Sequence, residues 1–189
     1  MATLPNSPLT EEQYLEIERL AEFKSEFHDG QMFAMSGGSP NHALLAVAIG
    51  ALLYSQMPKG CRVFSADLRI KVASAGLYTY PDCSVICGEL QLFSDQKDVV
   101  LNPLLIVEVL SPSTEGYDRG KKFELYRTIP SFQEYLIVHQ DQRHVEHFSK
   151  QDDGSWLLRD HVGVDDSVTI ARLGVHIPLA DLYASAIGL

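Results

Sequence analysis

The stretch Leu104–Leu110, with the sequence LLIVEVL, has Glu108 as its one polar residue. Pro103 precedes it and Ser111-Pro112 follow it. A short apolar run bounded in this way predicts a strand in a sheet covered on both faces. An ionised carboxylate in such a strand costs several kcal/mol unless a cation or hydrogen-bond donors compensate its charge. The sequence therefore indicates either a metal ion, a lysine or a cluster of donors beside Glu108, or a strand whose Glu108 lies close enough to one end to reach water.

A second acidic residue lies at the start of another strand-like segment. Residues 78–87 are rich in residues that favour strands, and Asp82 directly follows Pro81. Because proline cannot donate to a strand ladder, Pro81 is expected at the beginning of the strand. This predicts that Asp82 lies at the mouth of the sheet.

Downstream of both segments, residues 118–129 predict a helix that ends before Pro130. At about 100° per residue, Lys122 and Tyr126 share the apolar face of this helix, whereas Lys121 lies toward the other side. The helix therefore directs Lys122 toward the sheet, and Lys121 is the better candidate for a solvated lysine. One inward lysine and two carboxylates on successive strands predict a charge cluster.

This arrangement resembles the PD-(D/E)XK nuclease superfamily, which has the fold of restriction endonucleases. Pro81-Asp82 and Glu108-Val109 match the motif of that superfamily, but Leu110 stands where the motif has a lysine. Some members of the superfamily carry the lysine on the following helix, and Lys122 is placed for that role.

More narrowly, the chain is similar to the Uma-two family of proposed endonucleases between residues 9 and 182. The resemblance implies an α/β, restriction-endonuclease-like fold. The order of the predicted elements agrees, because it favours a mixed β-sheet flanked by helices, with additional antiparallel hairpins, in a single domain over residues 1–189. The segments that carry the similarity are residues 26–30, His42, 80–85, 108–114, 122–126 and 134–138.

The resemblance implies a metal-dependent endonuclease that hydrolyses phosphodiester bonds, with DNA as the expected partner. Asp82 and Glu108 would bind Mg²⁺ or Mn²⁺ together with the Val109 carbonyl, since these ions prefer oxygen ligands. Lys122 would position or deprotonate the attacking water. Glu26 would be a third acid, although it is equally well explained as a surface residue of a hairpin strand.

Two further residues match the family and are candidates for substrate binding. Tyr126, one turn after Lys122, would contact substrate or hold the lysine in place, and packing is the commoner role of such a tyrosine. His42 would contact substrate or be an ordinary polar residue at a helix end. The histidines at positions 139, 144, 147, 161 and 176 lack the spacing of helical metal ligands, so the sequence predicts no structural zinc site.

Local signals predict the elements at the amino-terminal end. Thr10-Glu11-Glu12-Gln13 is a capping-box pattern that opens a helix through Leu20. Residues 23–36 predict a hairpin that turns at Asp29-Gly30. Residues 41–57 predict a helix that is too apolar all round to lie on the surface.

The overall composition is that of an acidic globular protein. The chain has 189 residues, of which 46% are hydrophobic, and a net charge of -10, which opposes tight nonspecific binding to nucleic acid. No apolar run approaches the ~20 residues of a membrane span, and no signal-peptide pattern is visible. Cys61, Cys83 and Cys87 lack C-x-x-C spacing and are expected to be core thiols of a cytoplasmic protein.

The sequence is compatible with two functions: a nuclease, and a non-catalytic homodimeric scaffold or interaction module on the same fold. Asp82, Glu108 and the inward Lys122 together favour the nuclease, whereas the acidic charge and Leu110 favour the scaffold. A homodimer is expected in either case, because enzymes that cut duplexes often need two sites. A continuous basic groove beside Glu108 would support the nuclease, and an acidic rim would support the scaffold.

Overall fold

A six-stranded mixed sheet forms the centre of the computed structural model, which describes residues 8–94, 96–112 and 114–189. Its strand order is β11-β10-β9-β8-β6-β3. Strands β8 and β9 are parallel, as expected for two strands joined by a helix, and the other neighbours are antiparallel. The strands are β3 (Cys61–Ser65), β6 (Cys83–Cys87), β8 (Leu105–Val109), β9 (Glu134–Val138), β10 (His144–Lys150) and β11 (Trp156–Val162).

A five-stranded sheet with the order β2-β1-β5-β4-β7 lies beside the first. The segment predicted as one strand over residues 78–87 is divided between the two sheets, because the chain passes through Pro81 from β5 into β6. Asp82 consequently stands immediately before β6. The strands of this sheet are β1 (Ser25–His28), β2 (Gln31–Ala34), β4 (Arg69–Val72), β5 (Leu77–Thr79) and β7 (Val99–Val100).

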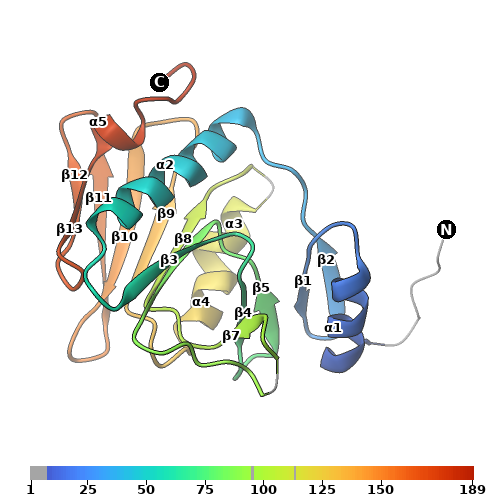
Figure 1. Ribbon diagram of the computed structural model, residues 1–189. Coiled ribbons are helices and arrows are strands. Elements are labelled where there is room, and N and C mark those ends of the chain that lie inside the picture. Colours follow the sequence, from blue (N-terminus) through green and yellow to red (C-terminus); the bar gives the residue numbers. More distant parts are fainter. Residues whose placement is uncertain (1–7, 95, 113) are drawn as a thin grey trace.

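Helices cover both faces of the six-stranded sheet, as predicted, whereas α1 packs on the five-stranded sheet. Helix α2 crosses one face and the segment containing α3 and α4 lies on the other, while the N-terminal hairpin and α5 lie at opposite ends of the molecule (Figure 1). The elements outside the two sheets are α1 (Glu11–Leu20), α2 (Pro40–Gln56), α3 (Glu115–Tyr117), the π-helical turn η1 (Asp118–Lys122), α4 (Phe123–Tyr126), β12 (Ser167–Ile170), β13 (Val175–Pro178) and α5 (Leu179–Leu182).

The residues of β8 divide between two cores according to the alternation of a strand. Val107 and Val109 pack in the cluster under α2, whereas Ile106 and Leu110 pack in the cluster under α4. Glu108 therefore points to the same side as Ile106 and Leu110, toward the segment that carries Lys122. The predicted apolar strand is thus buried on both faces, and its one acidic side chain faces the crossover segment.

Most of the predicted local elements are confirmed. Thr10 forms the complete capping box of α1, and the hairpin of β1 and β2 turns at Asp29-Gly30, where both residues have positive φ. The expected helix over residues 118–129 is instead divided into η1 and α4. None of the helices in the described residues combines enough length with enough apolar character to cross a membrane.

The prediction that the long apolar helix is buried all round was wrong. Helix α2 packs on the sheet through Leu45, Ile49 and Leu53, which share one stripe at a spacing of four. Its opposite side is open, with Val47 74% and Tyr54 76% exposed. The apolar composition of α2 therefore exceeds what its contact with the sheet requires.

The prediction of three core thiols was also wrong for two of them. Cys61 and Cys87 lie directly opposite each other in the antiparallel β3–β6 pair and form a disulfide. Sequence spacing alone did not indicate this pairing, because it depends on the register of two strands. Cys83 is a buried free thiol, as predicted, and burial raises its pKa to about 12.

We predict one titratable thiol in the unreduced, denatured protein and none in the native protein. The Cys61–Cys87 disulfide removes two thiols, and the buried Cys83 is both inaccessible and protonated at neutral pH. Counting thiols with a chromogenic disulfide reagent, before and after denaturation, measures this directly. Three thiols in the denatured, unreduced protein would contradict the disulfide.

Candidate active site

Glu108 is buried in the middle of the six-stranded sheet and meets a cation there. Its side chain is 6% exposed, and its Oε1 lies 2.9 Å from Lys122 Nζ. The Tyr126 hydroxyl donates a hydrogen bond of 2.8 Å to the same oxygen. Of the two alternatives that the sequence left open, the structure therefore has the compensated carboxylate, with a lysine and a tyrosine as its partners.

Lys122 reaches the sheet from the π-helical turn η1. Its Nζ lies 2.9 Å from Glu26 Oε1 and 3.4 Å from Asp118 Oδ1, in addition to its contact with Glu108. Burial would lower the pKa of Lys122, but the nearby carboxylates of Glu108, Glu26 and Asp118 raise it well above its usual range. Lys121, by contrast, is exposed and pairs with Glu124, as predicted for the solvated lysine.

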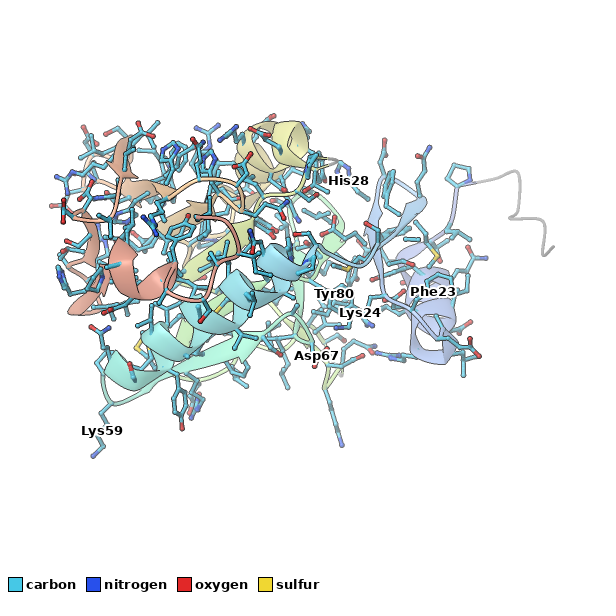
Figure 2. The ribbon with its side chains drawn as sticks, turned by 90° about the horizontal axis from the view of Figure 1, so that it is seen from above. Phe23, Lys24, His28, Lys59, Asp67 and Tyr80 are labelled. Atoms are coloured by element: carbon cyan, nitrogen blue, oxygen red, sulfur yellow. A yellow bond between two sulfur atoms is a disulfide. The ribbon has the colours of Figure 1, made fainter. Side chains whose placement is uncertain are left out.

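Glu26 enters the site from the hairpin rather than lying on the surface. In the β1–β5 pair, Phe27 lies opposite Tyr78, so Glu26 faces Thr79, whose hydroxyl donates to its carboxylate. Lys24 pairs with Asp67 and lies over the Tyr80 ring at the junction between the hairpin and the rest of the molecule (Figure 2). This junction places β1, and with it Glu26, beside Lys122.

Tyr126 is fully buried, and its contacts are within the cluster. Besides donating to Glu108, its hydroxyl lies 3.2 Å from the Thr79 hydroxyl, and the ring packs against Phe132 and Tyr135. It is not among the residues that line the adjoining cavity. Of its two predicted roles, these contacts correspond to holding the charged groups in place.

Asp82 lies at the mouth of the sheet and is held by two donors. Its Oδ2 accepts a hydrogen bond of 2.7 Å from the Val109 N–H and lies 3.4 Å from His42 Nε2. Asp82 raises the pKa of His42, with a further contribution from the Val109 backbone. The N–H of His42 also bonds to the capping hydroxyl of Ser39 at the start of α2, so His42 is a helix-end residue whose ring faces an acid of the site.

A cavity of about 740 Å³ opens onto these groups. Its lining includes the four acids Glu26, Asp82, Glu108 and Asp118, together with His42 and with His28 at the end of β1 (Figure 2). Among the described residues that line it, Lys122 is the sole lysine or arginine. The site therefore has the acidic rim that we expected of a scaffold, and not the continuous basic groove that we expected of a nuclease.

The crowding of carboxylates changes their ionisation. Burial, together with the charges of Asp118, Asp82 and Glu26, raises the pKa of Glu108 to about 8 against the opposing effect of Lys122. Burial likewise raises the pKa of Asp118. Within the described residues, the buried Asp118 Oδ1 has no hydrogen-bond partner, and its closest charge is Lys122.

Asp118 is the member of the cluster that sequence reasoning missed. It was taken as the start of a helix, yet it is 3% exposed and points to the same side as Lys122. Its position four residues before an inward-facing lysine is the signal that was available, since residues i and i+4 share a helical face. The acid was overlooked because helix starts commonly carry exposed acids.

Comparisons with known proteins identify the family of the chain. Residues 11–180 match the model of the Uma2 family, described as "Putative restriction endonuclease". Two uncharacterized proteins of Synechocystis sp. are similar in sequence. One is 37% identical over 187 residues, covering 97% of each chain, and the other is 40% identical over 168 residues, covering 88% of this chain and 95% of the relative.

A solved structure supports the fold independently. The crystal structure of a putative nuclease belonging to DUF820 from Anabaena variabilis superposes with a TM-score of 0.75 at 19% identity, covering 94% of this chain and 98% of that chain. The restriction-endonuclease-like fold expected from the sequence is thereby confirmed. Because the family match spans most of the chain and both relatives exceed 30% identity over most of their length, this protein belongs to the Uma2 family of nuclease-like proteins.

Proposed function

We propose that the chain is a divalent-metal-dependent endonuclease that hydrolyses phosphodiester bonds, with DNA as its substrate. The observation that carries this proposal is the buried contact between Glu108 and Lys122, surrounded by further carboxylates and open to a cavity. Burying several like charges together destabilises a fold, so a cluster of this kind is characteristic of a functional site. Membership of the Uma2 family adds independent support.

The donor set fits Mg²⁺ or Mn²⁺. Three carboxylates, those of Glu108, Glu26 and Asp118, surround a single lysine, and Asp82 adds a fourth negative charge near Glu108, which leaves an excess of negative charge. The Asp118 oxygen without a hydrogen-bond partner shows that this charge is incompletely compensated by the protein. Oxygen ligands are those that Mg²⁺ prefers, and Asp82 and Glu108 would hold the ion, with the Val109 carbonyl as a further ligand.

Once bound, the ion would supply positive charge that stabilises the negative charge developing on the phosphate. The chain's own groups would do the rest. The nearby carboxylates raise the pKa of Lys122, and this lysine would orient or deprotonate the attacking water. Tyr126 fixes Glu108, and His42 holds Asp82 from the edge of the cavity, where it can also meet substrate.

The acidic character of the chain restricts how substrate binds. Since the cavity lining offers one lysine and the chain carries a net charge of -10, affinity for a phosphodiester depends on the bound ion. Weak ground-state binding is compatible with catalysis, because only interactions that strengthen in the transition state accelerate the reaction. We therefore expect little binding to DNA without the divalent ion.

Besides the acidic rim of the cavity, an exposed helix face favours the alternative function, a non-catalytic homodimeric scaffold. Helix α2 exposes Val47 and Tyr54 on a face that makes no contact with the sheet. An apolar helix face of this kind suits contact with a second copy of the chain. Such a dimer is also compatible with a nuclease, so the oligomeric state by itself does not distinguish the two functions.

We predict that the purified protein cleaves nucleic acid in Mg²⁺ or Mn²⁺, and that Asp82→Asn, Glu108→Gln and Lys122→Met each reduce the rate by about 100-fold or more. Supercoiled plasmid, single-stranded DNA and RNA are the substrates to compare. Lys121→Met is the matched control, because that lysine lies next to Lys122 but is exposed and outside the cluster.

Cleavage that persists unchanged in the three variants would assign the activity to a contaminant and contradict the site. Absence of cleavage with every substrate and both ions would instead support the scaffold. Circular dichroism of each variant separates a lost activity from a lost fold, since Glu108 and Lys122 are both buried.

We also predict that Mn²⁺ affinity rises with pH. Because the pKa of Glu108 is raised to about 8, its carboxyl carries a proton below that pH, and the ion must displace this proton to bind. Affinity should increase roughly tenfold between pH 6.5 and pH 8 and level off above. Isothermal titration calorimetry at several pH values tests this, and an affinity independent of pH over this range would show that Glu108 is already ionised.

A further inference from the structure

A second cluster of side chains of the types that bind metal ions lies at the hairpin between β9 and β10. The His139 N–H donates to the His144 carbonyl across this hairpin, so the two histidines face each other. Glu146 lies two residues after His144 and therefore points to the same side of β10. The imidazole rings stack with their centres 4.1 Å apart, and His139 Nε2 lies 3.0 Å from Glu146 Oε1.

The three side chains satisfy the basic geometry of a metal site. One nitrogen from each histidine and one oxygen of Glu146 all lie within 4.8 Å of one another. His139 and Glu146 are 6% and 8% exposed, whereas His144 is partly open. His139 and His144 also line a cavity of about 1020 Å³, so a hydrated ion can approach from solvent.

This cavity is distinct from the candidate active site, although the two adjoin. Its lining contains none of Asp82, Glu108 and Lys122. In the sheet, Ile137 lies opposite Glu108 on one side and opposite Glu146 on the other. Two strand spacings therefore separate the two acids, a distance of about 10 Å. The lining residues that the two cavities share are Ser39, Ser111, Pro112 and Gln140.

A cation from the protein already lies between these ligands. Arg119 Nε is 2.9 Å from Glu146 Oε1, and a terminal nitrogen of the same guanidinium is 2.8 Å from His139 Nε2. Arg119 also pairs with Glu115, at the more exposed end of the cluster. Because Arg119 is 32% exposed and its side chain is long, it can move toward Glu115 and solvent while keeping one ion pair.

We propose that His139, His144 and Glu146 bind a transition-metal dication of the zinc class, with the Arg119 guanidinium displaced toward Glu115. Two imidazole nitrogens and one carboxylate oxygen are a ligand set that Zn²⁺ accepts with one position left open. Mg²⁺ prefers oxygen ligands and disfavours nitrogen ligands of this kind. The site thus differs in chemistry from the carboxylate cluster around Lys122 and does not depend on nuclease activity.

The sequence predicted no structural zinc site among these histidines, because they lack the spacing of helical metal ligands and because His144 and His147 face opposite sides of a strand. The ligands are brought together instead by the β9–β10 register, which sets residue 139 opposite residue 144 and leaves residue 146 on the same face. In a hairpin, cross-strand pairs and residues two apart share a face. A hairpin can therefore bring metal ligands together, as residues i and i+4 do in a helix.

We test the proposal by titrating the metal-free protein with Zn²⁺ in a calorimeter, in buffer containing excess Mg²⁺ to occupy the carboxylate site. We expect one Zn²⁺ per chain. His139→Ala and His144→Ala should each weaken binding by about tenfold or more, whereas Glu108→Gln should leave it unchanged. Arg119→Ala should tighten binding, because it removes the competing cation. His176→Ala is the matched control, since that histidine is exposed and lies outside both cavities.

Co²⁺ provides a second readout, because its visible absorption reports nitrogen and oxygen coordination at the bound ion. An absence of Zn²⁺ binding, or equal affinity in the wild type and His144→Ala, would overturn the proposal. Weaker binding by a folded Arg119→Ala would also overturn it, since Arg119 would then support the ligands instead of competing for them. His144 is the more open of the two histidines, so its variant keeps the test valid if His139→Ala does not fold.

Discussion

The structure depends on the compensation of one buried carboxylate. Glu108 lies in the interior of a sheet whose two faces are covered, where an isolated charge is costly. Lys122 supplies the opposite charge at 2.9 Å, and it does so from the segment that connects β8 to β9. The crossover therefore has to return across the face of the sheet on which Glu108 points, and the placement of η1 follows from that requirement. A lysine at position 110 would share the face of Glu108 within the strand, but Leu110 packs in the core there.

The cluster is assembled from parts of the chain that are distant in sequence. Glu26 comes from the N-terminal hairpin, Asp82 from the passage between the two sheets, Glu108 from the central strand and Asp118 from η1. No two of these four acids are neighbours in the sequence. Its carboxylates outnumber its lysine, and this imbalance opposes stability and is tolerated where a site needs it. Burial, together with this imbalance, raises the pKa of Glu108.

The π-helical turn η1 serves two clusters at once. Asp118 and Lys122 turn toward Glu108, whereas Arg119, between them in sequence, turns toward Glu146. Because Glu108, Ile137 and Glu146 lie in one row across three adjacent strands, the two clusters occupy the same face of the same sheet. Single π-helical turns are rare and are frequently found at functional sites, and here the turn distributes three charged side chains between two neighbouring groups. One of these groups offers oxygen donors, and the other combines imidazole nitrogen with a carboxylate.

The sequence by itself determined the features that rest on local patterns. The capping box at Thr10, the turn at Asp29-Gly30, the apolar strand around Glu108 and the inward direction of Lys122 all follow from spacing and backbone preference. The family resemblance rests on the same short segments. Only the tertiary structure decided which residues meet: that Glu26 and Asp118 join Lys122, that Cys61 bonds Cys87, and that His139 and His144 share a face with Glu146. The physical reason is register. A shift of one residue in a strand moves every side chain to the opposite face, and strand pairing between segments far apart in the chain is set by the packing of the whole molecule.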